Sequence, residues 1–203
     1  MARPLPPSPP VRAPGTRAAA MPADERRASI VAATRPLLIA HGAGVTTKQI
    51  AEASGIAEGT IFRVFPDKES LMRAVVDAAV DTEPLERALA RIDRSLPFED
   101  QLQEAVAVMQ RRLRDIWQLT AALGLPVRPP KGNGSTALVG LTAIFTAEPG
   151  RISCPPPFAA QALRALTLAM THPSLAPERP LKARAIVSLF LDGVRSRSER
   201  PPC

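Results

Sequence analysis

Aromatic residues and cysteines are scarce in this chain of 203 residues. Phe, Trp and Tyr together make up 3% of it, and tyrosine is absent. The two cysteines, Cys154 and Cys203, form no CxxC pair, which argues against a disulfide framework or a structural zinc site and fits a reducing cytoplasm. No run of 18 apolar residues occurs, so the sequence predicts no membrane-spanning helix.

Motifs of enzymes and cofactor sites are also missing. The two histidines, His41 and His172, have no patterned Ser, Cys or carboxylate partner. No glycine-rich phosphate loop, HExxH or nucleophile elbow is present. We therefore expect no enzyme, no cofactor and no metal.

The residues that are abundant favour helices. Hydrophobic residues make up 45% of the chain, and they are mainly Leu, Ala, Val and Ile without the alternating runs of strands. This composition predicts an all-α protein. The net charge of +7 favours polyanionic partners such as nucleic acid or an anionic membrane, although no block of five like charges forms a basic tail.

The first 21 residues differ from the rest. Residues 1–21 are rich in Pro, Ala and Arg, and proline lacks an amide donor, so we expect a disordered arm. Without a continuous apolar segment, this arm resembles neither a signal peptide nor a membrane anchor. It is either an idle tail or an arm that grips DNA through Arg3, Arg12 and Arg17.

Apolar periodicity and helix breakers divide the remainder. The predicted helices cover residues 23–41, 46–53, 57–65, 68–81, 84–95, 98–124, 135–147, 158–171 and 181–197. Gly42 ends the first helix, in which Pro36 predicts a kink and not a break. Thr46 and Gln49 form a capping box, and Asp67 caps the helix after Pro66. Residues 127–134 are predicted to be a mobile loop and residues 147–157 an irregular segment.

The clearest pattern lies in residues 46–65, TTKQIAEASGIAEGTIFRVF. In a helix-turn-helix two short helices cross closely, which requires a small residue at the crossing and a turn residue that tolerates positive φ. Ala51 and Gly55 meet these two requirements. The apolar residues that both helices need are Ile50, Ile56, Ile61 and Phe65. The alternative interpretation is an ordinary helical hairpin.

Residues 24–81 resemble the DNA-binding domain of the TetR family. The matching text is IVAATRPLLIAHG followed by VTTKQIAEASGIAEGTIFRVFPDKESL, whose FPDKE segment joins the third and fourth helices in that family. The resemblance implies a three-helix helix-turn-helix DNA-binding domain at 22–81 and a C-terminal helical domain for ligand binding and dimerisation at 82–203. It further implies a homodimer on a near-palindromic operator and a small-molecule effector that moves the two DNA-reading heads apart.

On this basis a set of residues is expected at the DNA. They are Thr46, Thr47, Lys48, Ala57, Glu58, Gly59, Thr60, Phe62, Arg63, Val64 and Lys68. Thr46 and Thr47 would face a phosphate, and Lys48 and Lys68 would supply charge to the backbone. Gly59 and Thr60 would approach base edges. Arg63 would contact a guanine through O6 and N7 or, equally, a phosphate or solvent.

Four positions call for comment against the family pattern. Phe62 replaces a common tyrosine whose hydroxyl contacts phosphate, and Val64 replaces a common histidine and could touch a thymine methyl. Ala57 stands where a serine often caps the recognition helix, so we expect the cap to be missing. Glu58 suits a helix N-terminus but repels phosphate, so it accepts from a cytosine amino group or rejects wrong sites.

The last two predicted helices carry apolar stripes that either pair with a second subunit or bury the subunit's own core. The expected dimer contacts are Leu163, Leu166, Met170, Val187, Phe190, Leu191 and Val194. Met109, Trp117 and Phe145 are candidate walls of a ligand pocket or, alternatively, plain core. Few polar groups lie in these helices, which suggests an apolar effector.

Two functions are consistent with the sequence. The first is a cytoplasmic, ligand-responsive repressor that binds DNA as a homodimer. The alternative is a helical interaction protein that keeps the fold but reads DNA weakly. This alternative is based on Phe62, Glu58 and Ala57, the positions that suit DNA binding least.

Overall fold

A computed structural model describes residues 21–125, 138–175 and 181–194. All of its elements are helices. They are α1 (Ala23–His41), the 3-10 helix η1 (Gly42–Gly44), α2 (Thr47–Ser54), α3 (Glu58–Val64), α4 (Lys68–Val80), α5 (Glu83–Ala90), α6 (Phe98–Ala122), α7 (Val139–Thr146), α8 (Pro156–Thr171) and α9 (Ala183–Val194). Since no strand occurs within these ranges, the predicted all-α class is confirmed.

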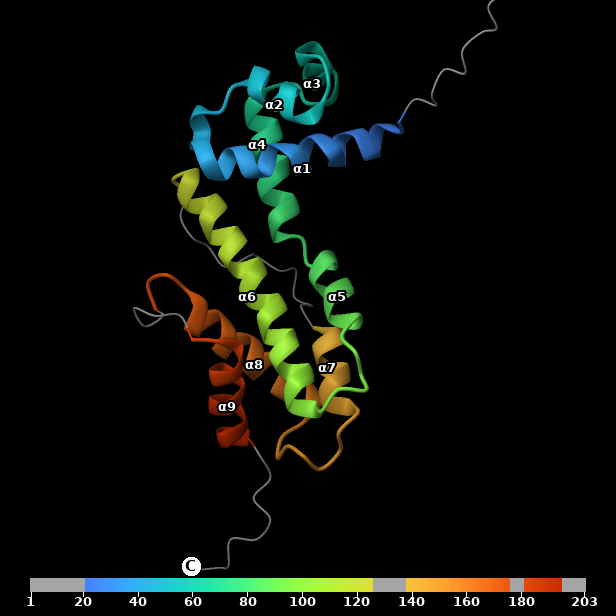
Figure 1. The fold of residues 1–203 in the computed structure, drawn as a ribbon, viewed down its shortest axis with the longest axis vertical. Coiled ribbons are helices and arrows are strands. Elements are labelled where there is room, and N and C mark those ends of the chain that lie inside the picture. Colours follow the sequence, from blue (N-terminus) through green and yellow to red (C-terminus); the bar gives the residue numbers. More distant parts are fainter. Residues whose placement is uncertain (1–20, 126–137, 176–180, 195–203) are drawn as a thin grey trace, which may run out of the picture.

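The helices form two groups joined by α6 (Figure 1). Helices α1 to α4 lie at one end of the molecule, where α2 and α3 are outermost. Helices α5, α7, α8 and α9 surround the far end of α6. The long α6 therefore contacts helices of both groups.

Each group has its own buried cluster of apolar side chains. The first consists of Ile30, Leu38, Val45, Ile50, Ala51, Ile61, Phe65, Leu71, Val75, Ala79, Ile116 and Leu119. The second contains Leu89, Phe98, Leu102, Val106, Met109, Leu141, Ile144, Phe145, Leu163, Ile186, Val187, Phe190 and Leu191, among others. Ile116 and Leu119 of α6 belong to the first cluster and Leu102 and Val106 of the same helix to the second, so both clusters depend on one helix.

Local signals account for the first group. Thr46 and Gln49 form the predicted capping box at α2, and Asp67 caps α4 together with Ser70. Helix α1 runs unbroken through Pro36, as predicted. Gly42 follows it with φ 58° and ψ −148°, and its N–H donates to the carbonyl of Leu38. These signals depend on residues within one turn, which is why they could be read directly.

Several boundaries in the second group differ from the prediction. Helix α5 ends at Ala90 and not at 95, because Asp93 accepts hydrogen bonds from the Ser95 N–H and hydroxyl and so forms a turn. The same bonds hold the pKa of Asp93 below its usual value. Helix α8 begins at Pro156, two residues early, because proline is favourable in a first helical turn.

Other boundaries shift by a few residues. Helix α6 ends at Ala122, and Gly124 adopts φ 63° just beyond it. Helices α7 and α9 begin at Val139 and Ala183, later than the predicted 135 and 181. Residues 1–20 of the predicted arm, the loop 127–134 and Cys203 lie outside the described residues, as do residues 195–197 of the last predicted helix.

Candidate nucleic-acid interface

The turn between α2 and α3 has the geometry of a helix-turn-helix. Gly55 adopts φ 65°, and the N–H of Ile56 donates to the carbonyl of Ala51 at 3.0 Å. Ala51 is buried in the first cluster. Of the other predicted packing residues, Ile50, Ile61 and Phe65 are buried, and Ile56 is half-buried against the same cluster.

Helix α3 presents one face to solvent at the outer end of the molecule (Figure 1). Exposed positions from the predicted DNA set are Thr46, Lys48, Ala57, Glu58, Gly59, Phe62 and Arg63. Thr47, Thr60, Val64 and Lys68 are half-buried. A Cβ added at Gly59 would have no heavy atom within 4 Å, so a nucleic-acid backbone could approach closely there. The helix is therefore outward-facing, as the DNA-binding interpretation requires.

The N-terminus of α3 lacks the usual cap. Ala57 occupies the cap position and makes no side-chain hydrogen bond, as predicted. Instead, the hydroxyl of Thr47, the first residue of α2, donates to a carboxylate oxygen of Glu58. This bond joins the N-termini of the two helices and was not expected from the sequence.

The C-terminus of α3 contacts Arg27 of α1. The guanidinium of Arg27 lies over the ring of Phe65, 4.3 Å from its centroid, and Nη1 donates to the carbonyl of Val64 at 3.4 Å. Arg27 was not among the residues predicted from the sequence. Its spacing was a usable signal, because Arg27 precedes the buried Ile30 by three residues and so shares its helical face.

Lys68 is engaged within the protein. Its Nζ donates to the carbonyl of Ala43 in η1 at 2.7 Å. A phosphate contact by Lys68 would have to compete with this hydrogen bond or share the ammonium group, which has three donors.

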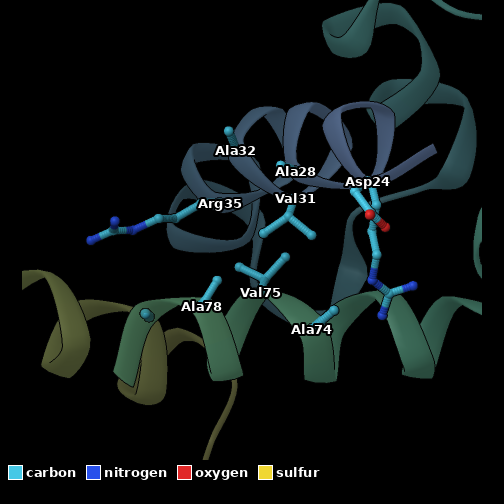
Figure 2. A pocket seen from close by; sticks show the side chains of 10 residues that line it. Asp24, Ala28, Val31, Ala32, Arg35, Ala74, Val75 and Ala78 are labelled. Carbon is cyan, nitrogen blue, oxygen red and sulfur yellow. The ribbon is translucent and has the colours of Figure 1, made fainter. Parts of the chain in front are cut away.

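A shallow pocket opens between α1 and α4, away from the predicted ligand residues (Figure 2). Its volume is about 420 Å³. Ala28 and Val31 line it from α1, and Ala74, Val75 and Ala78 line it from α4, while Asp24 and Arg35 lie toward its two ends.

The three side chains predicted to wall a ligand pocket are buried. Phe145 packs edge-on against Phe98, with ring centroids 5.8 Å apart, and Met109 belongs to the same cluster. Trp117 packs edge-on against His172 at 5.2 Å. In this structure the three side chains fill space, in line with the alternative that they are plain core.

Most of the predicted dimer contacts also lie in the subunit's own core. Leu163, Val187, Phe190 and Leu191 are at most 5% exposed, so a second subunit could not reach them in this arrangement. Leu166 and Met170 are half-buried, and the side chain of Val194 lies outside the described residues. Phe158 of α8 and Leu189 of α9 are instead exposed, at 61% and 52%. The burial of these four side chains is in line with the alternative that the stripes bury the subunit's own core.

Two interactions connect α6 to the first group of helices. Arg35 of α1 forms an ion pair with Asp115 at 2.8 Å, and Arg112 donates to the carbonyl of Asp81 at the end of α4. Burial lowers the pKa of Arg112, although the guanidinium stays charged. These contacts hold α1 and α4 against α6.

Metal and membrane sites find no support in the described ranges. No group of three or more His, Cys, Asp or Glu side chains there could hold a metal ion. Within the same ranges, no helix has the length and apolarity needed to cross a bilayer.

Comparisons with known proteins agree with this geometry. Residues 30–75 match the family model of the bacterial regulatory proteins, tetR family. No curated protein matches the chain. Many solved structures share its fold.

Three of those structures illustrate the likeness. One, from work on the control of antibiotic production by bacterial hormones, is 23% identical with a TM-score of 0.58, and the match covers 85% of this chain and 98% of that one. A TetR transcriptional regulator from Streptomyces coelicolor is 24% identical with a TM-score of 0.54, covering 83% and 98%. A complex of SmeT with triclosan is 17% identical with a TM-score of 0.51, covering 86% and 93%. Residues 30–75 thus carry the N-terminal domain of bacterial regulatory proteins of the tetR family, and the chain as a whole shares the fold of these solved structures.

Proposed function

We propose that the chain is a ligand-responsive repressor that binds a near-palindromic operator as a homodimer. In this proposal residues 22–81 form the DNA-binding domain and residues 82–203 the regulatory and dimerisation domain. The observation that carries the proposal is the outward face of α3. Gly59, Phe62 and Arg63 are exposed there, while Ile61 and Phe65 anchor the helix from behind.

The DNA-reading part of the proposal predicts a defined operator. Selection of bound duplexes from a random pool by the full chain should yield an inverted repeat. Its half-sites should lie about 10 base pairs apart or somewhat more. Arg63→Ala should relax one position in each half-site and cost about 1–3 kcal/mol of binding free energy. If selection enriches nothing over random DNA at a salt concentration that suppresses non-specific binding, the helical interaction protein becomes the better interpretation.

The homodimer is proposed to use the outer faces of α8 and α9. Phe158 and Leu189 are large apolar side chains that this subunit leaves exposed. Leu166 and Met170, on the same helix as Phe158, are half-buried. Leu189→Glu should therefore shift the chain toward monomer in sedimentation equilibrium, because a charge would be buried without a partner. Val139→Glu is the matched control, since Val139 is 68% exposed but lies on α7 across α6 from α9 (Figure 1). Equal effects of the two substitutions would contradict this choice of surface.

The effector is proposed to be apolar and to enter beside α6, where Met109, Trp117 and Phe145 would have to move aside. The binding of triclosan by SmeT, a protein of this fold, supports an apolar compound as the first probe. Trp117 is the single tryptophan, so a change in its fluorescence on titration with triclosan would report binding close to α6. An unchanged emission spectrum, together with undisturbed DNA binding, would count against this probe and this location.

A further inference from the structure

We propose that Arg27 and Glu58 are positioning residues that hold the two ends of α3, and that neither acts by contacting DNA. This inference rests on the proposed function, because α3 is the helix that would read the operator. It assigns Arg27 a role that the DNA-contact set does not include, and it replaces the expected contact of Glu58 with a cytosine.

Helix α3 needs support from outside itself. It has seven residues, and helices this short are unstable in water without tertiary contacts. Ala57 offers no side-chain cap, and Ile61 is the one side chain within Glu58–Val64 that is fully buried. The direction of α3 therefore depends on what is attached to its two ends.

At the N-terminal end, the attachment is the hydrogen bond from Thr47 to Glu58. A carboxylate is favourable there because the helix dipole is positive at this end. Since Thr47 is the first residue of α2, the bond fixes the beginning of α3 to the beginning of its partner helix. It also occupies the hydroxyl that was expected to face a phosphate.

At the C-terminal end, the attachment is Arg27. One guanidinium covers the Phe65 ring at 4.3 Å and donates to the Val64 carbonyl, so it meets both an aromatic face and a helix-end carbonyl. A planar guanidinium can satisfy both contacts at once, whereas a lysine ammonium is a point charge and cannot stack. The two ends of α3 are thus bound to two different helices, α1 and α2.

Hydrogen exchange of the full chain without DNA tests the Arg27 contact. Arg27→Gln and Arg27→Lys should both raise the exchange rates of the amides in residues 58–65, by about threefold. Arg26→Gln is the matched control, because Arg26 donates to the Met21 carbonyl at 3.1 Å and not to α3. Unchanged exchange in Arg27→Gln, or full restoration by lysine, would overturn the role assigned to Arg27.

A double-mutant cycle tests the Thr47–Glu58 contact by the same readout. Thr47→Val and Glu58→Ala should each raise exchange in residues 58–61 by about threefold, and the double variant should exchange no faster than either. Thr47→Ser, which retains the hydroxyl, should behave like the unsubstituted chain. Additive effects of the two substitutions would show that the groups act separately and would overturn this part.

Salt dependence of binding separates positioning from phosphate contact. Arg27→Gln should weaken binding to the selected operator more than to random DNA and leave the dependence of log K on log salt unchanged. A lost phosphate contact would weaken both equally and reduce that slope by about one, which would refute the proposal for Arg27. If the unsubstituted chain prefers no DNA at all, the proposed function fails, while the exchange measurements still decide this inference.

Discussion

Two glycines with positive φ lie in contrasting surroundings. Gly55 adopts φ 65° in the turn of the helix-turn-helix, where an added Cβ would meet nothing within 4 Å. Gly42 adopts φ 58° and ψ −148°, a region open almost only to glycine, and its Cβ would lie 2.5 Å from the Ala122 carbonyl oxygen. Gly42 is therefore the point where the end of α1 approaches the end of α6.

These surroundings predict different costs for the same substitution. Gly55→Ala should lower the free energy of unfolding by about 1–2 kcal/mol, the cost of a left-handed alanine. Gly42→Ala should cost about 3 kcal/mol or more, because backbone strain adds to a collision with backbone. Urea denaturation followed by circular dichroism measures both. Equal costs would mean that the contact between Gly42 and α6 is not made in solution.

Among single helices, α3 differs from its neighbours α2 and α4 in how it begins. Helices α2 and α4 both begin with a capping box, whereas the residue before α3 is Ala57, whose backbone is already extended, with φ −72° and ψ 143°. A serine there could accept a hydrogen bond from a free N–H of the first turn without a change in the backbone.

Ala57→Ser should therefore stabilise the protein, by about 1 kcal/mol in the free energy of unfolding. It should also slow amide exchange within α3. Ala53→Ser serves as the control, since Ala53 is exposed inside α2 and serine there meets no unpaired N–H. Destabilisation by Ala57→Ser, or an equal effect of both substitutions, would contradict the missing-cap interpretation.

At the scale of the whole molecule, α6 makes the two groups of helices interdependent. Ile116 and Leu119 complete the first cluster, while Leu102, Val106 and Met109 of the same helix lie in the second. The Arg35–Asp115 ion pair and the Arg112–Asp81 hydrogen bond add polar contacts at the same junction. Helix α6 thus contacts both α1 and α4, and α1 in turn contacts α3.

This shared helix predicts a single unfolding transition. Leu119→Ala should lower the free energy of unfolding by about 2–5 kcal/mol, because Leu119 is fully buried. In denaturation of this variant, as of the unsubstituted chain, Trp117 fluorescence and far-ultraviolet circular dichroism should change at the same midpoint. Leu113→Ala, at a half-buried position of the same helix, should cost less. Separate midpoints for the two signals would show that the groups unfold independently.

The helix-turn-helix could be predicted because its signals are local. The capping residues Thr46 and Asp67, the turn at Gly55 and the stop at Pro66 each act within about one helical turn, so their effect hardly depends on the rest of the chain. The same holds for the missing cap at Ala57. The end of α5 was harder to predict, because it depends on a weaker signal, the turn at Asp93.

Composition and local patterns were enough to predict the all-α class, the position of the helix-turn-helix and the apolar stripes on α8 and α9. Three features emerged only from the packing of distant segments: Leu163 and Phe190 face the subunit's core while Phe158 and Leu189 face outward, α6 contributes to two cores, and Arg27 meets the end of α3. This is because periodicity shows that one side of a helix is apolar, whereas the contact that buries that side comes from segments far away in the chain.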